Sequence, residues 1–570
     1  RVIELSARHP RTVAALLAAL MAWAVVCLHE TPLDALPDLS DPQVIVFTEW
    51  MGRSPDLVED QITYPLVRAL RSTPGGVEVV RGYSMFWMSF VYVIFPECTD
   101  LYWARSRVTE LLPRVSMPPD VVPQLGPDAT GVGWIYQYVV EDASGELDLA
   151  ELRTLQEFTI RPALQAVDGV AEVATIGGFE RQYQVIVDPE RLVAFGLSVG
   201  DVSRAASDAN SEVGARVLEV AGTEYVLRGR GYVRSLADVE ASVVAIGPAG
   251  APILVRDVAR VSFGPDIRRG AADYNGLGEA TGGIVVMRMG QNALEVAERV
   301  EARIAELSLP EGVRIVPTYD RAELIEGSVA TLTETLVEEL LIVSLVCLFF
   351  LLSFRAAFVA VVVMPIATLL AFIPMYYVGL TTNIMSLGGI AIAISELEDA
   401  STTFTENATR RLATLAPGED RWRAIVDSAK QVGRPTFYSL LLTTACFLPI
   451  LTLTGQAGRL FRPLAFSFAF ATFAAAILSV TVGPPLMTAL LGRGRFRRDE
   501  ENPFNRVFRR AYQPLARLVV RARWLVVALA LGVVAGTVPV ALGLGSEFMP
   551  PLDEGSLLVM PTTFSGISIE

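Results

Sequence analysis

Residues 383–407, NIMSLGGIAIAISELEDASTTFTEN, combine the length of a membrane span with four carboxylates. The first half is apolar and contains Gly388 and Gly389, small residues that allow two helices to approach closely. The second half carries the acidic residues Glu396, Glu398, Asp399 and Glu406. Ionised groups at membrane depth are costly and are usually functional, so this stretch predicts a spanning helix with a role in ion or proton movement.

Helical geometry places three of these acids on one side. Asp399 and Glu406 are seven residues apart and almost eclipsed, Glu396 lies on the same flank, and Glu398 points elsewhere. Burial and like charges both raise carboxylate pKa values towards neutrality, which suits a proton relay. We therefore predict Asp399, Glu406 and Glu396 as relay residues. The alternative is a helix that ends near Ser395, with the acids in a cytoplasmic loop.

The composition indicates a membrane protein. The chain has 570 residues, of which 52% are hydrophobic, and this favours several membrane spans over a soluble enzyme. A formal charge of −15 argues against a nucleic-acid partner. With only two histidines, a histidine-built zinc site is not expected, and a soft-metal site would use methionine, cysteine or carboxylates.

Residues 1–30 are predicted to form an N-terminal membrane anchor. Three arginines precede the apolar run 12–28, which favours a cytoplasmic N-terminus. A cleaved signal peptide is the competing interpretation, but the run is long for one and no small-x-small site follows it.

Residues 31–333 are polar and carry alternating strand and helix patterns. The first unit has the order of a split βαβ motif, with strands at 44–48, 77–81 and 90–95 and helices at 55–70 and 101–112. A second unit has segments at 135–140, 149–164, 170–176, 283–289, 293–307 and 313–318. An inserted, strand-rich subdomain at about 185–268 interrupts it. We predict two α+β sandwiches, one of them bearing the insertion.

The remaining spans follow in quick succession, at 336–353, 357–378, 383–407, 435–454, 463–491 and 524–544. Residues 334–492 therefore form spans two to six, and 524–545 the seventh. The arginine-rich segment 493–523 is predicted to be cytoplasmic, with an amphipathic helix at 505–520 on the membrane surface. Residues 546–570 read as the start of a second extracytoplasmic domain. The chain begins without Met, and we expect it to be part of a protein about twice as long.

Four motifs carry a resemblance to a known family: DALPDLSD (34–41), YWARSR (102–107), GPDATGVGWIYQY (126–138) and NIMSLGGIAIAI (383–394). They resemble the resistance-nodulation-division (RND) heavy-metal efflux pumps, in particular the copper and silver subgroup. The resemblance implies a polytopic α-helical membrane protein with periplasmic, ferredoxin-like α+β pore subdomains and an inserted docking subdomain. It also implies a secondary active transporter and not an enzyme: a homotrimer in a Gram-negative inner membrane that exchanges protons for Cu(I) or Ag(I).

The same resemblance implies partners and site residues. The partners are a periplasmic adaptor protein and an outer-membrane channel. Asp399 matches the family's central relay aspartate and Glu406 the glutamate of its Glu-Asn pair. Met560 matches a methionine of the periplasmic substrate site, and Met385 one on a metal path through the membrane. Thioethers suit the soft cations Cu(I) and Ag(I), although a single membrane methionine is more often packing than ligand.

Some positions depart from the family pattern. Leu397, Phe404 and Ile267 stand where copper pumps tend to carry methionine, and Glu396 and Glu398 fit neither the monovalent nor the divalent branch. The lysine and glutamate that partner the relay in the family belong to the second half of such pumps. Two alternatives therefore stay open: export of divalent zinc, cobalt or cadmium, and a non-transporting remnant that binds metal or assembles with a partner.

Met85 and Met88 flank Phe86 and Trp87 in a methionine-aromatic patch. Placed three residues apart on one strand, the two methionines would face opposite sides of a sheet. The sequence therefore does not predict that they bind one ion together.

Overall fold

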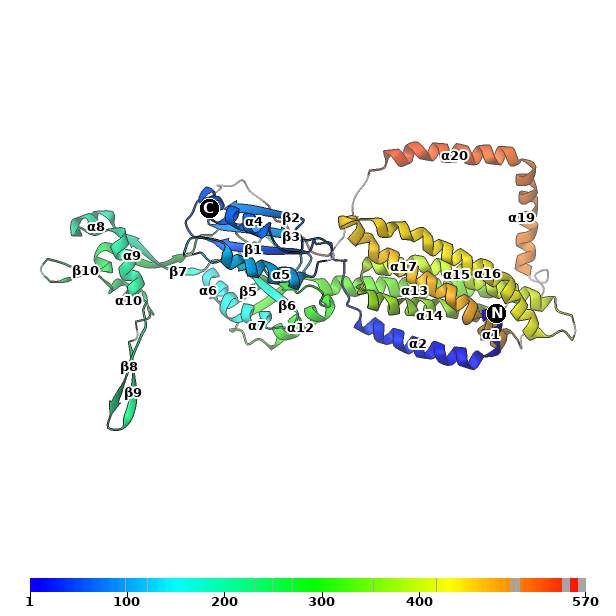
Figure 1. Cartoon of the computed structure of the whole chain (residues 1–570), viewed down its shortest axis with the longest axis horizontal. Helices are drawn as coiled ribbons and strands as arrows, with labels where there is room; N and C mark the ends of the chain where they lie inside the picture. Colours follow the sequence, from blue (N-terminus) through cyan, green and yellow to red (C-terminus); the bar gives the residue numbers. More distant parts are fainter. Residues whose placement is uncertain are drawn as a thin grey trace.

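The computed structural model describes residues 1–97, 99–119, 121–229, 231–248, 250–268, 270–351, 353–416, 418–492, 496, 503–545 and 554–561. The molecule is elongated, with a helical bundle at one end, two sheets in the middle and a strand-rich insertion at the other end (Figure 1). The predicted start of a second domain at 546–570 lies largely outside the described residues.

The first sheet has the strand order β2-β3-β1-β4 and is antiparallel throughout. Its strands are β1 Gln43–Glu49, β2 Val79–Met85, β3 Met88–Ile94 and β4 Gln124–Leu125. The segments α3 Pro55–Val58, the π-helical turn Glu59–Thr63, α4 Tyr64–Leu70 and α5 Leu101–Leu111 supply its helices. Alternate strand residues such as Val46 and Val91 are fully buried in one core with Ile62 and Val108 of these helices, which therefore cover one face of the sheet.

The two-residue turn between β2 and β3 changes the prediction for Met85 and Met88. The structure places Met85 at the end of β2 and Met88 at the start of β3, directly opposite each other in the antiparallel register. Directly paired residues point to the same face of a sheet. The prediction that the two side chains face opposite sides is therefore wrong, because the chain reverses between them.

The second sheet has the order β14-β5-β13-β6. Counted along the chain, its first and third strands lie in the centre and its second and fourth at the edges, as in the first sheet. The strands are β5 Trp134–Asp142, β6 Val170–Gly177, β13 Thr281–Met287 and β14 Val313–Asp320. The helices are α6 Leu149–Leu155, the π-helical turn Gln156–Ile160, α7 Arg161–Gln165 and α12 Ala293–Glu306. Their packing against the strands forms one core that includes Tyr138, Leu164, Val285 and Val300.

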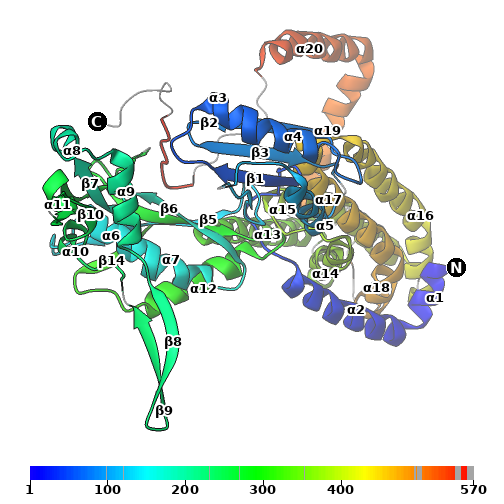
Figure 2. The ribbon, with the colours of Figure 1, turned by 60° about the vertical axis from the view of Figure 1, so that its left-hand side comes forward.

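The insertion is carried on a two-stranded ribbon of β7 Arg181–Val187 and β12 Ala259–Pro265. Beyond the ribbon lie α8 Pro189–Phe195, α9 Val199–Asp208, β8 Val213–Val220, β9 Thr223–Gly229, α10 Leu236–Glu240, β10 Val243–Ile246, β11 Pro252–Leu254 and α11 Val255–Val258. The β8–β9 hairpin projects away from the rest of the molecule (Figure 2). Its large apolar side chains Leu218, Tyr225 and Val226 are exposed. The hairpin therefore presents an apolar surface.

The bundle consists of long apolar helices. Its elements are α1 Val2–Arg8, α2 Pro10–Glu30, α13 Arg321–Leu351, α14 Phe354–Val378, α15 Ile384–Ala413, α16 Arg421–Phe447, the 3-10 turn Leu448–Thr452, α17 Gly455–Thr481 and α18 Gly483–Leu491. Two further helices, α19 Pro503–Arg521 and α20 Arg523–Gly543, lie largely apart from the bundle (Figure 1). Among the described residues, five helices are long and apolar enough to cross a membrane: α2, α14, α16 with its 3-10 turn, α17 and α20. The chain is a membrane protein.

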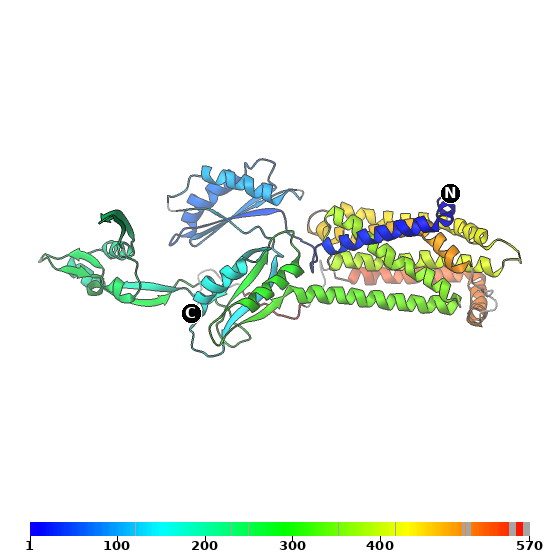
Figure 3. The same ribbon diagram turned by 90° about the horizontal axis from the view of Figure 1, so that it is seen from below.

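The other two predicted spans lie in α13 and α15, which carry more acidic residues than these five. Both pack against α14, and α13 runs directly from the end of β14 into the bundle (Figure 3). The predicted span 463–491 is wrong in its extent, because the helix breaks at Val482 into α17 and α18. Pro484 and Pro485 lack the backbone N–H that a continuous helix needs there.

Candidate functional site

The acid-bearing helix α15 is continuous from Ile384 to Ala413. Asn383 caps its start: the Asn383 side chain accepts from the Ser386 backbone N–H at 3.0 Å, and the Ser386 hydroxyl accepts from the Asn383 N–H at 2.8 Å. The acids therefore lie within a helix, and the alternative of a helix ending near Ser395 is wrong.

The four acids occupy two sides of α15. Asp399 and Glu406 are exposed, whereas Glu396 and Glu398 are half-buried. The opposite side, with Leu397, Ala400, Phe404 and Ala408, is buried in the bundle. Among the described residues, no ion pair involves any of these four carboxylates. Within the part of the chain that the structure describes, the flank of Asp399 and Glu406 therefore has no cationic partner.

Close packing fixes α15 against α17. A Cβ atom added at Gly389 would lie 2.4 Å from the Leu464 carbonyl oxygen and 2.2 Å from the Ser467 hydroxyl, so no larger residue fits without a shift of the helices. Gly388 meets nothing within 4 Å. The predicted role of these glycines in close helix packing is therefore confirmed for Gly389 and not seen at Gly388.

A loop after α2 joins α15 to the second sheet. The Asp34 N–H donates to the Thr382 carbonyl at 3.0 Å, the Thr382 N–H to Pro32 at 2.9 Å, and the Ile384 N–H to Ala35 at 3.2 Å. The loop thus pairs with the residues that begin α15. Because β14 leads directly into α13 beside it, any shift of α15 along its axis must move this loop.

A buried ion pair holds the same loop to the start of α13. Arg321, the first residue of α13, is 4% exposed and its guanidinium lies 2.7 Å from the Asp34 carboxylate. It also donates to the Val132 carbonyl. Burial raises the pKa of Asp34 above its usual range, and the guanidinium opposes that rise without cancelling it. Since a cation at a helix N-terminus opposes the helix dipole, Asp34 offsets an otherwise unfavourable charge. Arg321 was missed in the sequence, where it is one arginine among many.

Two arginines of α17 form ion pairs with acids in the loops beside the first sheet. Arg459 lies 2.7 Å from the Asp41 carboxylate and donates to the Leu39 carbonyl at 3.0 Å. Arg462 lies 3.2 Å from the Glu97 carboxylate. The structure thus shows that acids from residues 39–97 neutralise both arginines.

The motifs at 102–107 and 126–138 meet one another. The Tyr102 hydroxyl donates to Asp128 at 3.0 Å, and the Arg105 guanidinium donates to the Gly126 carbonyl at 2.8 Å. The hydrogen bond to Asp128, ahead of burial, raises the pKa of Tyr102. These residues therefore tie α5 of the first sheet to the loop that leads into β5 of the second.

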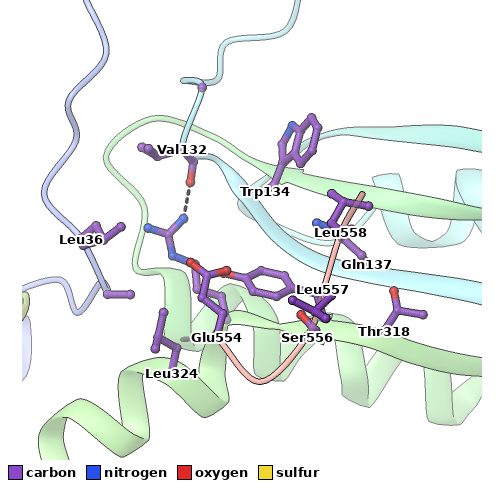
Figure 4. Close-up of a pocket in the computed structure, with 14 residues that line it drawn as sticks. Leu36, Val132, Trp134, Gln137, Thr318, Leu324, Glu554, Ser556, Leu557 and Leu558 are labelled. Carbon is purple, nitrogen blue, oxygen red and sulfur yellow. Dashed lines mark hydrogen bonds between the residues drawn. The ribbon is translucent and has the colours of Figure 1, made fainter. Parts of the chain in front are cut away.

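A pocket of about 530 Å³ lies between the loop after α2, the second sheet and the segment 554–558. Ala35 and Leu36 are the residues of that loop that line it. Figure 4 shows the segment 554–558 passing across the sheet, with Leu558 beside Trp134 and Gln137. Burial first, and the nearby Glu554 carboxylate second, raise the pKa of Tyr319 to about 12, so its hydroxyl remains protonated at neutral pH. The pocket is mixed in character, with apolar walls and a few polar groups, as ligand pockets commonly are.

The two predicted metal ligands lie beside elements that meet at this pocket. Met560 is 68% exposed and follows Leu558, which lines the pocket, by two residues. Met385 is half-buried in the first turn of α15, next to Ile384, whose N–H donates to the pocket residue Ala35. Of the positions that differ from the copper pumps, Leu397 and Phe404 are buried in the bundle, while Ile267 is exposed.

Comparison with known proteins identifies the family. The model of the AcrB/AcrD/AcrF family matches residues 2–570. The chain belongs to this family. It is 45% identical over 563 residues to the cation efflux system protein CusA of Escherichia coli K12, and 45% over 564 residues to the putative cation efflux system protein SilA of Salmonella typhimurium. Each alignment covers 96% of this chain and 53% of the relative, so the chain spans about half the length of these relatives.

More distant relatives and solved structures agree. The cobalt-zinc-cadmium resistance protein CzcA of Cupriavidus metallidurans is 34% identical over 559 residues, covering 95% of this chain and 52% of CzcA. A crystal structure of a heavy metal efflux pump superimposes with a TM-score of 0.79 at 30% identity, covering 97% of this chain and 53% of that one. A second crystal form gives 0.74 at 32% identity, over 86% of this chain and 48% of the other.

Proposed function

We propose that this chain is the permease subunit, or the first half of it, of a proton-driven heavy-metal efflux system that exports Cu(I) or Ag(I). The observation that carries the proposal is α15: a continuous helix in a family of efflux pumps, with Asp399 and Glu406 on one exposed flank that has no ion pair to any other described residue. Identity to CusA and SilA exceeds that to CzcA, which favours the monovalent metals. The protein acts as a secondary transporter and not as an enzyme.

In this proposal Asp399 is the central proton carrier, with Glu406 and Glu396 beside it. A carboxylate that alternates between charged and neutral forms biases a bundle between two arrangements, because burial of the charged form is costly. Movement of α15 would reach the pocket through the hydrogen-bonded loop around Asp34 and Thr382. Protonation would thereby be coupled to the shape of the metal site.

Met560 and Met385 are the proposed metal ligands, because thioether sulfur prefers soft monovalent cations. The proximity of Met560 to the 530 Å³ pocket supports a role in the substrate site, and the position of Met385 at the start of α15 supports a role at the membrane entrance. Buried Leu397 and Phe404, in place of methionines, favour the divalent alternative to a smaller extent.

The proposed setting is the bacterial inner membrane, with the two sheets and the insertion in the periplasm. The two four-stranded sheets then serve as ferredoxin-like pore subdomains, and the insertion as the docking subdomain. The projecting β8–β9 hairpin, with its exposed apolar side chains, suits contact with a neighbouring copy in a homotrimer. A periplasmic adaptor and an outer-membrane channel complete the complex.

The proposal is tested by silver and copper survival of a bacterium that lacks its own pump. The chain, joined to the second half of a related pump, is expressed with adaptor and channel, and we expect it to restore growth. Asp399→Asn should abolish that growth, whereas Asp38→Asn, which changes an exposed loop acid, should not. Failure of the joined chain despite normal membrane insertion would reject transport and leave the non-transporting remnant. Rescue against zinc or cobalt only would favour the divalent alternative.

A further inference from the structure

Met85 and Met88 lie directly opposite each other where β2 turns into β3. Paired residues of an antiparallel ladder have Cβ atoms about 4.5–5.5 Å apart and project to the same face. Methionine side chains are unbranched and flexible, so two thioethers that start this close together can reach one ion.

The two methionines lie on the open face of the first sheet. Along β3, Ser89 and Val91 are fully buried under the helices, and Met88 alternates with them to the other side. Glu49 of β1 is paired with Met88, so the same row across three strands reads Met85, Met88 and Glu49. A carboxylate therefore stands beside the thioethers on the face of the sheet opposite its own helices.

The turn between the methionines is held in an unusual conformation. Trp87 has a φ of 59°, in the left-handed region that favours glycine and is costly for a bulky residue. Two hydrogen bonds hold it there: the Trp87 N–H donates to the Arg53 carbonyl at 2.9 Å, and the Trp50 N–H donates to the Trp87 carbonyl at 2.7 Å. The turn is thus clamped to the loop 50–53, which also carries the exposed Met51.

Exposure separates these methionines from those that serve as packing. Met364, Met375 and Met487 are at most 3% exposed inside the helical bundle, whereas Met85 is 48% exposed, Met88 is half-buried and the neighbouring Met51 is 59% exposed. Within this chain these side chains are not core residues. Two thioethers with one carboxylate are a donor set for a soft, singly charged metal ion.

We propose that Met85 and Met88 form a thioether site for Cu(I) or Ag(I) on the open face of the first sheet, with Glu49 balancing the charge of the ion. The site belongs to a different sheet from the pocket near Met560. It rests on the proposed function for its metal class, and it adds a second place where the cargo binds outside the membrane. The clamped turn fixes the spacing of the two ligands before the metal arrives.

The site is tested by binding of Ag(I) to the whole chain in detergent micelles. The methionine methyl groups are labelled with carbon-13, and silver nitrate is added in chloride-free buffer. We expect the methyl signals of Met85 and Met88, assigned by their loss in Met85→Leu and Met88→Leu, to shift together at the first equivalents. Equilibrium dialysis should show one bound Ag(I) fewer per chain in each variant. Sodium ions should cause no shift.

Met289→Leu is the matched control, because Met289 is 42% exposed and follows a strand of the second sheet. Methionine to leucine conserves volume, and unchanged signals from the buried methionines verify the fold. Undiminished Ag(I) binding in Met85→Leu and Met88→Leu would overturn the proposal. Ag(I) binding is measured independently of transport. Loss of bound Ag(I) in these variants therefore supports the site even if the chain fails to restore growth in the survival assay. Undiminished Ag(I) binding together with restored growth rejects the site and leaves the proposed function standing.

Discussion

The acids of the loop 34–41 and the acids of α15 differ in how they are neutralised. In the loop, Asp34 pairs with Arg321, Asp41 pairs with Arg459, and Asp38 accepts the Ser40 backbone N–H. On α15, Asp399 and Glu406 have no ion pair among the described residues. The ion pairs of Asp34 and Asp41 hold the loop to α13 and α17. On α15 no described residue supplies such a pair, so a change of charge there breaks no ion pair of the described chain.

Replacement of Asp34 is the most severe test of this difference. Asp34→Asn leaves the Arg321 guanidinium buried and unpaired, and arginine cannot shed its proton to escape. We expect a loss of stability of about 3–5 kcal/mol. Thermal unfolding in detergent, followed by circular dichroism, measures it. Asp38→Asn in the same loop is the control and should unfold like the original chain; equal stability of both variants would show that the ion pair is not structural.

Replacement of Arg321 should reduce stability less than replacement of Asp34. The Asp34 carboxyl group can take up a proton and become neutral, whereas the Arg321 guanidinium cannot lose one. In Arg321→Leu the carboxyl group can take up a proton, so we expect a loss of about 1–3 kcal/mol, the cost of one unsatisfied buried group. The loss should also depend on pH. Burial already raises the pKa of Asp34 from its usual value of 3.8, and without the guanidinium it rises further.

The sign of that dependence follows from linkage. The folded variant binds the Asp34 proton more tightly than the unfolded chain, so stability is highest below the unfolded pKa and falls as the pH rises through the raised folded value. Unfolding curves of Arg321→Leu and Arg321→Leu/Asp34→Asn from pH 4 to 8 measure it. The double variant has no carboxyl group at this position, so its curve should lack the fall; a fall of the same size in both would assign it to other groups.

The sequence predicts what depends on neighbours along the chain. The membrane length of residues 383–407 and the 3.6-residue period place three acids on one flank, and the structure confirms a single helix that exposes Asp399 and Glu406. The structure adds that Asn383, the residue before Ile384, caps the start of the helix. These features need only local geometry, since helix periodicity fixes the relative directions of side chains.

What the sequence could not predict depends on partners far along the chain or on unusual turns. Nothing near Arg321 marks it as the partner of Asp34, because the pair closes a loop that contains both sheets. The Phe86-Trp87 turn contains no glycine, asparagine or proline, the residues that usually identify a two-residue hairpin. The sequence analysis places Met85 and Met88 on one strand, and so it does not predict their direct pairing across the turn.

The smallest expected effect is on the stability of Asp399→Asn. Because Asp399 is exposed on the flank of α15 and has no ion pair among the described residues, loss of its charge should change the stability of the chain by no more than about 0.5 kcal/mol. Asp41→Asn is the matched comparison: its partner Arg459 is mostly buried but Asp41 itself is half exposed, so a cost of up to about 1 kcal/mol is expected. The same unfolding assay measures both. A large loss in Asp399→Asn would show that a partner within this chain holds the carboxylate, as Arg321 holds Asp34.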